Sequence, residues 1–317
     1  IALQRIDGII YDVGNEDIYS QPSDVYYEVF VRAFYDSDGD GIGDLQGLAS
    51  KIPYLASLGI TGIWMMPINQ NNSSHGYDTI DYYAVEEDYG TMEDFEYLAD
   101  VAHEYGIDLV MDLVINHCSS QNVWFQEALK GETLEDGTHN KYYDYFYFLP
   151  PDANIVDKTD AEIKAEKAAY LEEHGSLEGW VEQYPALDNA TDNNAPITGA
   201  SSSGVWRQVN DESSPLNGYY YMAIFGGMVD LNLTNPEVRQ ECIDIANFWL
   251  DKGMDGFRLD ACRHIYGKYY STIHTEEVFA QNKAWWQEFT AAVTADHPDA
   301  YLIGEVWVLY TEFMVPD

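Results

Sequence analysis

Two carboxylates and one guanidinium lie near the ends of two apolar stretches in the last third of the chain. GFRLDACRH, residues 256–264, contains Arg258 and Asp260, and GEVW, residues 304–307, contains Glu305. A neighbouring guanidinium favours the ionised form of a carboxylate, as a nucleophile requires, whereas an apolar setting favours the protonated form that a general acid requires. Asp260 therefore suits a nucleophile and Glu305 a general acid/base. A purely structural ion pair between Arg258 and Asp260 is the alternative interpretation.

The order of these two stretches in a sheet decides whether the carboxylates meet. If the stretches form neighbouring strands, Asp260 and Glu305 lie at the same level at the strand ends. Carboxylates about 5 Å apart are the arrangement of a retaining glycoside hydrolase, in which a covalent glycosyl-enzyme forms. Neighbouring strands would therefore favour hydrolysis of a glycosidic bond.

A third apolar stretch ends in DLVINH, residues 112–117. Side chains on a strand alternate between its two faces, so Asp112 and Asn116 share one face, and His117 follows at the exit. Polar residues at the end of an apolar strand indicate a binding site. Alternatively, Asn116 and His117 only satisfy backbone groups where a loop begins.

The stretch YDSDGDGIGDLQG, residues 35–47, combines glycines with four regularly placed carboxylates, Asp36, Asp38, Asp40 and Asp44. Such spacing is typical of the first half of an EF-hand loop, in which oxygen ligands converge on Ca²⁺. The twelfth position of an EF-hand loop carries a bidentate Glu, and here that position is Gly47. The stretch therefore predicts a calcium-binding loop of another kind, with a solvated acidic turn as the alternative.

The composition limits the ligands that the protein binds. Of its 317 residues, 46% are hydrophobic and 15% aromatic, which suffices for a substantial core. Asp and Glu outnumber Lys and Arg by 55 to 15, and the formal charge of −40 repels nucleic acids and anionic membrane surfaces. Neutral ligands and cations fit this charge better.

The cysteines and the hydropathy pattern add two expectations. Cys118, Cys242 and Cys262 are too few and odd in number for a disulfide framework, so they are expected to be small buried hydrophobic residues. No run of about 18 apolar residues is present, so no membrane span is expected.

Apolar stretches alternate with amphipathic stretches of helical length, which indicates βα units around a parallel sheet. Strands are expected at residues 25–31, 60–66, 107–115, 255–261 and 301–307. Helices are expected after Thr91 and Asn235-Pro236 and through residues 276–296. A doubly wound open sheet is the main alternative to a barrel. Because the polar residues follow several different strands, a barrel is favoured.

One long interruption, residues 118–227, separates the third strand from the helix before the fourth. It contains two aromatic clusters, KYYDYFYF and NGYYYMAIF, and a charged stretch with helical character, DKTDAEIKAEKAAYLEEHG. This composition indicates a small inserted subdomain that rests against the main one. The expected division is therefore 1–117 and 228–317 for the main domain and 118–227 for the insertion.

Together the motifs resemble the conserved segments of the α-amylase family of glycoside hydrolases, family 13. The resemblance rests on DLVINH, GFRLDACRH and GEVW in this order, with HGYD at 75–78 and MVDLNLTNP at 228–236, and extends from Val25 onward. It is closest to bacterial α-amylases that degrade starch or maltodextrin. It implies an α/β fold, a (β/α)8 TIM barrel with a subdomain inserted after strand 3.

The resemblance also implies a role for each motif residue. Asp260 would be the nucleophile, Glu305 the acid/base, and Arg258 the group that orients and ionises Asp260. His117 and Asp112 would bind the reacting sugar or support that wall, and Tyr77 would stack on its apolar face. His264, in the pair Arg263-His264, would contact the leaving-group sugar.

For metals, the resemblance implies structural calcium. The loop after the first strand would bind one Ca²⁺ through the carboxylates named above and the carbonyl of Ile42, at the rim of the barrel. A second Ca²⁺ would lie between barrel and insertion, held by Asn116 and the carbonyl of His264. A dockerin-like module also uses such loops, but it needs two copies and the sequence has one.

The chain departs from the family pattern at its end. The sequence ends at Asp317, just after the fifth strand, and has no His-Asp dipeptide, the motif that carries the third catalytic carboxylate after the seventh strand of the family. The expectation is a barrel truncated after about the fifth strand. The remaining strands would come from a missing C-terminal part or another chain. A natural half-enzyme with only a binding role is disfavoured because Asp260, Glu305 and Arg258 are present.

The expected substrate is an α-glucan, and the expected activity is cleavage of internal α-1,4 bonds of starch or maltodextrin. The alternatives are an exo-acting α-glucosidase or an oligo-1,6-glucosidase of the same family, and a starch-binding or transporter-associated protein without hydrolysis. An extracellular or cell-surface location follows only from the substrate class.

Overall fold

The computed structural model describes residues 24–158, 160–185, 206–223, 228–266 and 276–306, and two short strands, β1 (Arg5–Ile6) and β2 (Ile9–Ile10). Trp307 and the end of the expected insertion, residues 224–227, lie outside this part of the chain.

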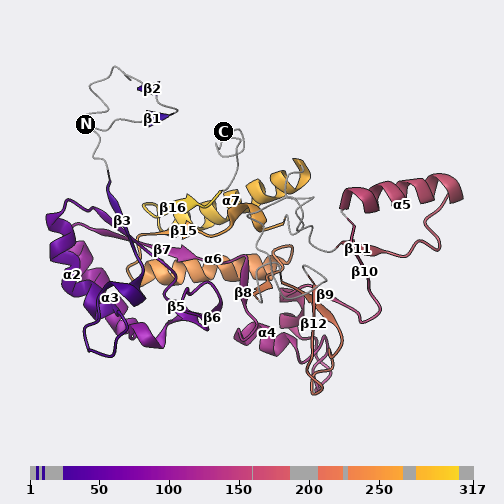
Figure 1. Ribbon diagram of the computed structural model, residues 1–317, viewed down its shortest axis with the longest axis horizontal. Helices are drawn as coiled ribbons and strands as arrows, with labels where there is room; N and C mark the ends of the chain where they lie inside the picture. Colours follow the sequence, from indigo (N-terminus) through magenta and orange to yellow (C-terminus); the bar gives the residue numbers. More distant parts are fainter. Residues whose placement is uncertain are drawn as a thin grey trace.

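A five-stranded parallel sheet forms the centre of the molecule (Figure 1). Its spatial order is β16-β15-β7-β4-β3, so each strand lies beside the one that precedes it in this series. The strands are β3 (Tyr26–Val29), β4 (Gly62–Met65), β7 (Asp108–Leu113), β15 (Gly256–Leu259) and β16 (Tyr301–Gly304). All five expected strands are present, each shorter than its apolar stretch because the ends turn into loops.

The sheet is strongly curled. Neighbouring strands lie about 4.8 Å apart, so the edges of a flat five-stranded sheet would be roughly 19 Å apart. Tyr26 on one edge strand and Tyr301 on the other nevertheless stack, with ring centroids 5.4 Å apart and an interplanar angle of 19°. A curled sheet of consecutive parallel strands is a section of a barrel, and it excludes the doubly wound alternative, in which the strand order reverses.

Helices connect the consecutive strands. They are α1 (Val31–Phe34), α2 (Leu45–Ser57), α3 (Met92–Glu104), α6 (Pro236–Asp251) and α7 (Glu276–Asp296). Their starts follow local chemistry: the side chain of Asp44 caps α2, Thr91 forms a capping box with Asp94 at α3, and Asn235 caps α6 ahead of Pro236. The helix starts expected at Thr91 and Asn235 are thus confirmed.

The main core lies between the sheet and these helices. Helix positions at i, i+3, i+4 and i+7 face the sheet, as in α2, where Leu45, Leu48, Ile52 and Leu55 are at most 1% exposed. The opposing strand residues are equally buried, including Ile63, Leu109, Met111 and Phe257. Because this packing fixes the strands, it also fixes the positions at which they end.

The long segment between β7 and β15 begins and ends in one strand pair. β8 (His117–Ser119) pairs antiparallel with β14 (Met228–Asp230), with His117 opposite Asp230. Between them lie α4 (Val123–Ala128), η2 (Lys141–Tyr145), β9 (Phe148–Leu149), β10 (Asn154–Val156), α5 (Asp160–His174), β11 (Gln183–Pro185), β12 (Trp206–Gln208) and β13 (Tyr220–Met222). Figure 1 shows α5 extending away from the sheet. The division at 117/118 and 227/228 stays a prediction, and it coincides with this strand pair.

Four short elements follow the strands β4 and β15. The hairpin of β5 (Asn69–Asn71) and β6 (Thr79–Val85) follows β4, with η1 (Glu87–Tyr89) after it, and η3 (Cys262–His264) follows β15.

All three cysteines are buried and free, which confirms their expected role as small core residues. In the part of the chain that the structure describes, no helix is both long and apolar enough to cross a membrane.

Candidate active site

The three sequence motifs converge at the C-terminal ends of β7, β15 and β16. In the strand register, Arg258 lies opposite Asp112, and Leu259 lies opposite Gly304. Asp260 and Glu305 are the next residues along their strands, so they lie at the same level on neighbouring strands. The two apolar stretches therefore form neighbouring strands, which is the arrangement that the sequence analysis required for the two carboxylates to meet.

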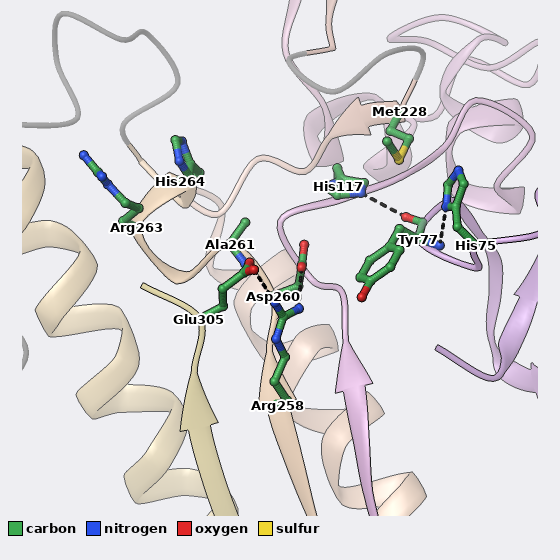
Figure 2. A pocket seen from close by; sticks show the side chains of 10 residues that line it. All are labelled: His75, Tyr77, His117, Met228, Arg258, Asp260, Ala261, Arg263, His264 and Glu305. Carbon is green, nitrogen blue, oxygen red and sulfur yellow. Dashed lines mark hydrogen bonds and ion pairs between the residues drawn. The ribbon is translucent and has the colours of Figure 1, made fainter. Parts of the chain in front are cut away.

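Arg258 joins three carboxylates, of which Figure 2 draws Asp260 and Glu305. Its Nη1 lies 2.7 Å from Oδ1 of Asp112 and 2.6 Å from Oδ1 of Asp260, and its Nη2 contacts Oε1 of Glu305. The guanidinium also lies over the ring of Trp64, 5.7 Å from its centroid. One planar cation thus sets the positions of both proposed catalytic groups and of the buried Asp112 beside them.

The site is electrostatically strained. Burial raises the pKa of Asp260 to about 7, with Glu305 and Asp112 adding to the rise and Arg258 opposing it. Burial likewise raises the pKa of Asp112 to about 6, against the lowering effect of Arg258 and Tyr77. Arg258 lowers the pKa of Asp260, in the direction expected of it, while desolvation of the buried carboxylate acts in the opposite direction.

Tyr77 and His117 form the wall opposite Glu305. The Tyr77 hydroxyl donates to Oδ2 of Asp112 at 2.8 Å, and Nε2 of His117 lies 2.9 Å from the Tyr77 carbonyl oxygen. Figure 2 shows the Tyr77 ring beside Asp260, where it can meet a bound sugar. Asp112 is fully buried and does not line the cavity, so of its two expected roles the structure favours support of the wall.

A cavity of about 370 Å³ lies over the two carboxylates. Its lining combines six expected residues with four others. The expected ones are Tyr77, His117, Arg258, His264, Asp260 and Glu305, and the others are His75, Met228, Ala261 and Arg263. The motifs contain a signal for all four, since each lies in HGYD, MVDLN or the stretch after Asp260. Nδ1 of His75 accepts a hydrogen bond from the Tyr77 backbone N–H at 3.1 Å, which ties the HGYD turn together.

Ala261 has an unusual backbone. Its φ of 45° and ψ of 42° make it left-handed, the only non-glycine residue with positive φ in the described part of the chain. This conformation directs its N–H to Oε2 of Glu305 at 3.1 Å. Strain of this kind is retained where the surrounding structure demands it, often at active sites. Composition and hydropathy give no sign of this contact.

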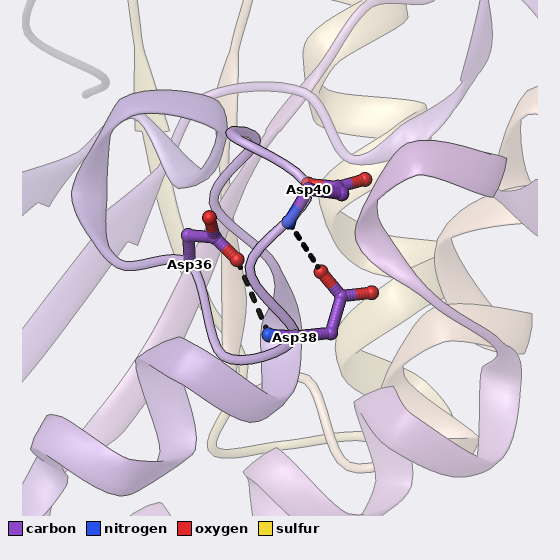
Figure 3. A group of neighbouring side chains, drawn as sticks. All are labelled: Asp36, Asp38 and Asp40. Atoms are coloured by element: carbon purple, nitrogen blue, oxygen red, sulfur yellow. Dashed lines mark hydrogen bonds between the residues drawn. The ribbon is translucent and has the colours of Figure 1, made fainter.

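The acidic loop brings three carboxylates together (Figure 3). Oxygens of Asp36, Asp38 and Asp40 lie within 4.8 Å of one another. The loop folds around Asp36, whose carboxylate accepts hydrogen bonds from backbone N–H groups, chiefly of Gly39 and Gly41, and these lower its pKa. An all-oxygen, anionic donor set at this spacing fits Ca²⁺, which would staple the loop and take no part in catalysis.

Two further ligands are expected in this loop, the Asp44 carboxylate and the Ile42 carbonyl, and of these the carboxylate accepts hydrogen bonds within the loop. The Asp44 carboxylate accepts from the N–H groups of Ser37 and Gly47 at 2.7 and 2.6 Å and so caps α2. The N–H of Ile42 donates to Oδ1 of Asp40 at 2.7 Å. Ligation by Asp44 and by the Ile42 carbonyl stays a prediction.

Asn116 lies at the second expected calcium site. Its side chain is fully buried, and neither Oδ1 nor Nδ2 has a hydrogen-bond partner among the described residues. Buried amides are almost always hydrogen-bonded, so an unsatisfied pair of atoms indicates a ligand or water. An amide oxygen is a suitable calcium ligand. A contribution from the carbonyl of His264 stays a prediction.

Comparison with known proteins agrees with the site. Residues 28–316 match the family model of the α-amylase catalytic domain. The chain is 37% identical to α-amylase 3 of Dictyoglomus thermophilum, over 91% of this chain and 45% of the relative. It is 32% identical to a probable oligo-1,6-glucosidase of Bacillus subtilis, over 89% of this chain and 44% of the relative.

Solved structures give the same result. The crystal structure of an α-amylase from H. orenii superposes with a TM-score of 0.63 and 35% identity, covering 90% of this chain and 47% of that one. This chain thus spans less than half the length of each of these relatives. With the motifs, the curled parallel sheet and the family match in agreement, the chain belongs to the α-amylase family of glycoside hydrolases.

Proposed function

We propose that the protein containing this chain cleaves internal α-1,4-glucosidic bonds of starch or maltodextrin with retention of configuration. The observation that carries the proposal is the bridge from Arg258 to both Asp260 and Glu305 under the cavity. Retention uses carboxylates about 5 Å apart and inversion roughly 6.5–9.5 Å. Contact of both carboxylates with one guanidinium supports the shorter separation.

The geometry supports a double displacement. Asp260 attacks the anomeric carbon as Glu305 gives its proton to the glycosidic oxygen, so the C–O bond breaks and a glycosyl-Asp260 ester forms. Glu305, now a carboxylate, removes a proton from water, whose oxygen attacks the same carbon and releases Asp260. The ring of Tyr77 holds the reacting sugar against the pair, and Arg258 positions both carboxylates throughout.

The elevated pKa of Asp260 has a consequence for this cycle. A nucleophile reacts as the carboxylate, and Asp260 is destabilised in that form by burial. Formation of the ester removes the buried negative charge, so the desolvation free energy of the Asp260 carboxylate favours the first step.

An exo-acting activity on α-glucosides, including α-1,6 bonds, is the second candidate. The observation in its favour is the similarity to the probable oligo-1,6-glucosidase. This relative is 32% identical to the chain, close to the 37% of α-amylase 3. Early products from amylose decide between the two. A ladder of mixed oligosaccharides supports internal cleavage, whereas glucose alone supports exo action.

The Glu305→Gln variant tests the catalytic proposal itself. Glutamine keeps the shape of the side chain but cannot donate or accept the proton, so kcat is expected to fall by about 10³-fold or more. Glu288→Gln is the matched control, because Glu288 lies on α7, is about half exposed and pairs with Arg239 of α6. Unchanged turnover in Glu305→Gln would remove Glu305 from the catalytic machinery, whereas glucan binding without turnover in the unsubstituted protein would favour a glucan-binding protein.

Two further parts of the proposal concern calcium and location. Asp36, Asp38 and Asp40 are proposed to hold one structural Ca²⁺, and Asn116 to ligate a second. Because starch and maltodextrin are commonly met outside the cell, we place the protein in the extracellular space or at the cell surface.

A further inference from the structure

The turn after Asp260 and the end of β16 are joined through one carbonyl group. The Leu259 carbonyl oxygen accepts from the backbone N–H of Glu305 at 2.9 Å and from Sγ of Cys262 at 3.2 Å. The first of these contacts holds Glu305 and the second holds the turn. The Cys262 thiol therefore lies directly beside the strand end that carries Glu305.

Cys262 has little freedom to move. It is 6% exposed, and its carbonyl oxygen accepts from Nε1 of Trp286 on α7 at 2.9 Å. Its thiol can leave the Leu259 carbonyl only by giving up a hydrogen bond in a buried setting. The backbone of Cys262 is thus held by Trp286 and its side chain by Leu259.

Gly304, the last residue of β16, faces this thiol, which lies in η3. A Cβ built on Gly304 would lie 2.9 Å from Sγ of Cys262, and its next neighbours would be at 3.7 and 3.8 Å. The φ of Gly304 is outside the left-handed region, so its backbone accepts an alanine without strain. The obstacle to a side chain at residue 304 is therefore the thiol, and not the backbone conformation.

We infer that Gly304 and Cys262 are a matched pair of positioning residues that sets Glu305 against Asp260. Resting on the proposed function, this inference assigns a role to two residues that lie outside the cavity. A methyl group at residue 304 falls about 0.5 Å short of ordinary contact distance, so either the thiol or the end of β16 must move. Misplacement of a catalytic group by about 1 Å can cost roughly 10²-fold in rate.

The experiment is a double-mutant cycle in the protein that carries this chain, with maltoheptaose as substrate. Gly304→Ala is expected to lower kcat about tenfold and to change KM by less than twofold, because the acid/base moves and the sugar contacts remain. Cys262→Ala removes Sγ and is expected to cost up to about threefold. In the double variant, Cys262→Ala should restore kcat to within about threefold of the unsubstituted protein.

Cys242 supplies the matched control, because it is a second buried thiol and lies on α6. Gly304→Ala combined with Cys242→Ala should stay as slow as Gly304→Ala alone. A kcat of Gly304→Ala within twofold of the unsubstituted protein overturns the inference, and so does a failure of Cys262→Ala to restore activity. If Gly304→Ala does not fold, the double variant with Cys262→Ala decides alone, because it lacks the clash with Sγ. A tenfold loss of kcat in that double variant would contradict the inference.

The outcome is separable from that of the proposed function. Full turnover in Glu305→Gln would remove the catalytic role of Glu305 whatever the cycle shows. If Glu305→Gln has no turnover but Gly304→Ala keeps the kcat of the unsubstituted protein, only the positioning role of Gly304 and Cys262 is contradicted.

Discussion

The backbone N–H of Ala261 donates to Oε2 of Glu305 at 3.1 Å, so the residue after Asp260 holds the carboxylate of Glu305. On its other oxygen, Glu305 contacts Nη2 of Arg258. The two groups act from different sides, one from the turn and one from the strand below it. The proposed acid/base is thereby held in one position before substrate binds, as preorganised catalysis requires.

Arg258→Lys is expected to lower kcat by about 10²-fold and to destabilise the protein at pH 8. A lysine ammonium is a single point charge and cannot bridge Asp112, Asp260 and Glu305 with paired nitrogens. Removal of a charged partner from a buried pair costs about 3–5 kcal/mol, and because lysine keeps one charge the loss should be a part of this, measured by thermal unfolding. Arg32→Lys, in the partly exposed pair of Arg32 with Asp88, is the control and should stay near the unsubstituted values. Equal behaviour of the two variants would contradict the bridging role.

Asp260→Asn is expected to be inactive but more stable than the unsubstituted protein at pH 8. The pKa of Asp260 is raised to about 7 in the folded state, from an ordinary value of 3.8. Between these values the unfolded chain loses its proton first, so the carboxylate lowers folding stability as pH rises from about 4 to 7. The gain in melting temperature should be full at pH 8 and vanish near pH 4. A gain that grows on acidification would contradict the raised pKa.

Tyr77 can be divided into ring and hydroxyl by two substitutions. Tyr77→Phe removes only the hydrogen bond to Asp112 and should lower kcat/KM about three- to tenfold. Tyr77→Ala also removes the ring, and we expect a loss of about 10²-fold, with a clear rise in KM for maltoheptaose. Tyr54→Ala, at a tyrosine that is 59% exposed on α2, should be neutral. If Phe and Ala at residue 77 lose equally, the ring does not contact the sugar.

Calcium is expected to raise the melting temperature by several degrees, and a chelator should reverse the effect. Asp38→Asn should reduce this response, because Asp38 is one of the three clustered carboxylates and is otherwise exposed. Asp211→Asn is the matched control, an exposed aspartate whose carboxylate accepts from Ser213 at 2.9 Å. A calcium response of equal size in both variants would show that the loop is not the binding site.

Local chemistry in the sequence was sufficient for the framework. Alternating apolar stretches gave five strands, and capping residues gave the starts of α3 and α6. These predictions succeeded because a strand needs only its apolar run and a helix start needs only its cap. The motif residues Asp260 and Glu305 were also visible, since a carboxylate directly after an apolar strand has few structural uses.

Two properties, the curl of the sheet and the pKa of Asp260, depend on the tertiary structure and cannot be read from neighbours in the sequence. The stacking of Tyr26 on Tyr301 separates a curled barrel section from an open sheet, and it depends on the packing of all five strands. The net rise in the pKa of Asp260 depends on how many groups desolvate it, and the sequence shows only the neighbouring Arg258.

Residues in loops also separate what the sequence predicts from what the tertiary structure decides. Asp44 follows the spacing of a metal ligand, yet its carboxylate caps α2, because the helix begins at the next residue. The contact of Ala261 with Glu305 joins residues 44 positions apart and exists only because β15 and β16 are neighbours. The sequence determined which groups are available and on which elements they lie. Strand order and packing decided which of them meet, because proximity between distant residues is a property of the whole sheet.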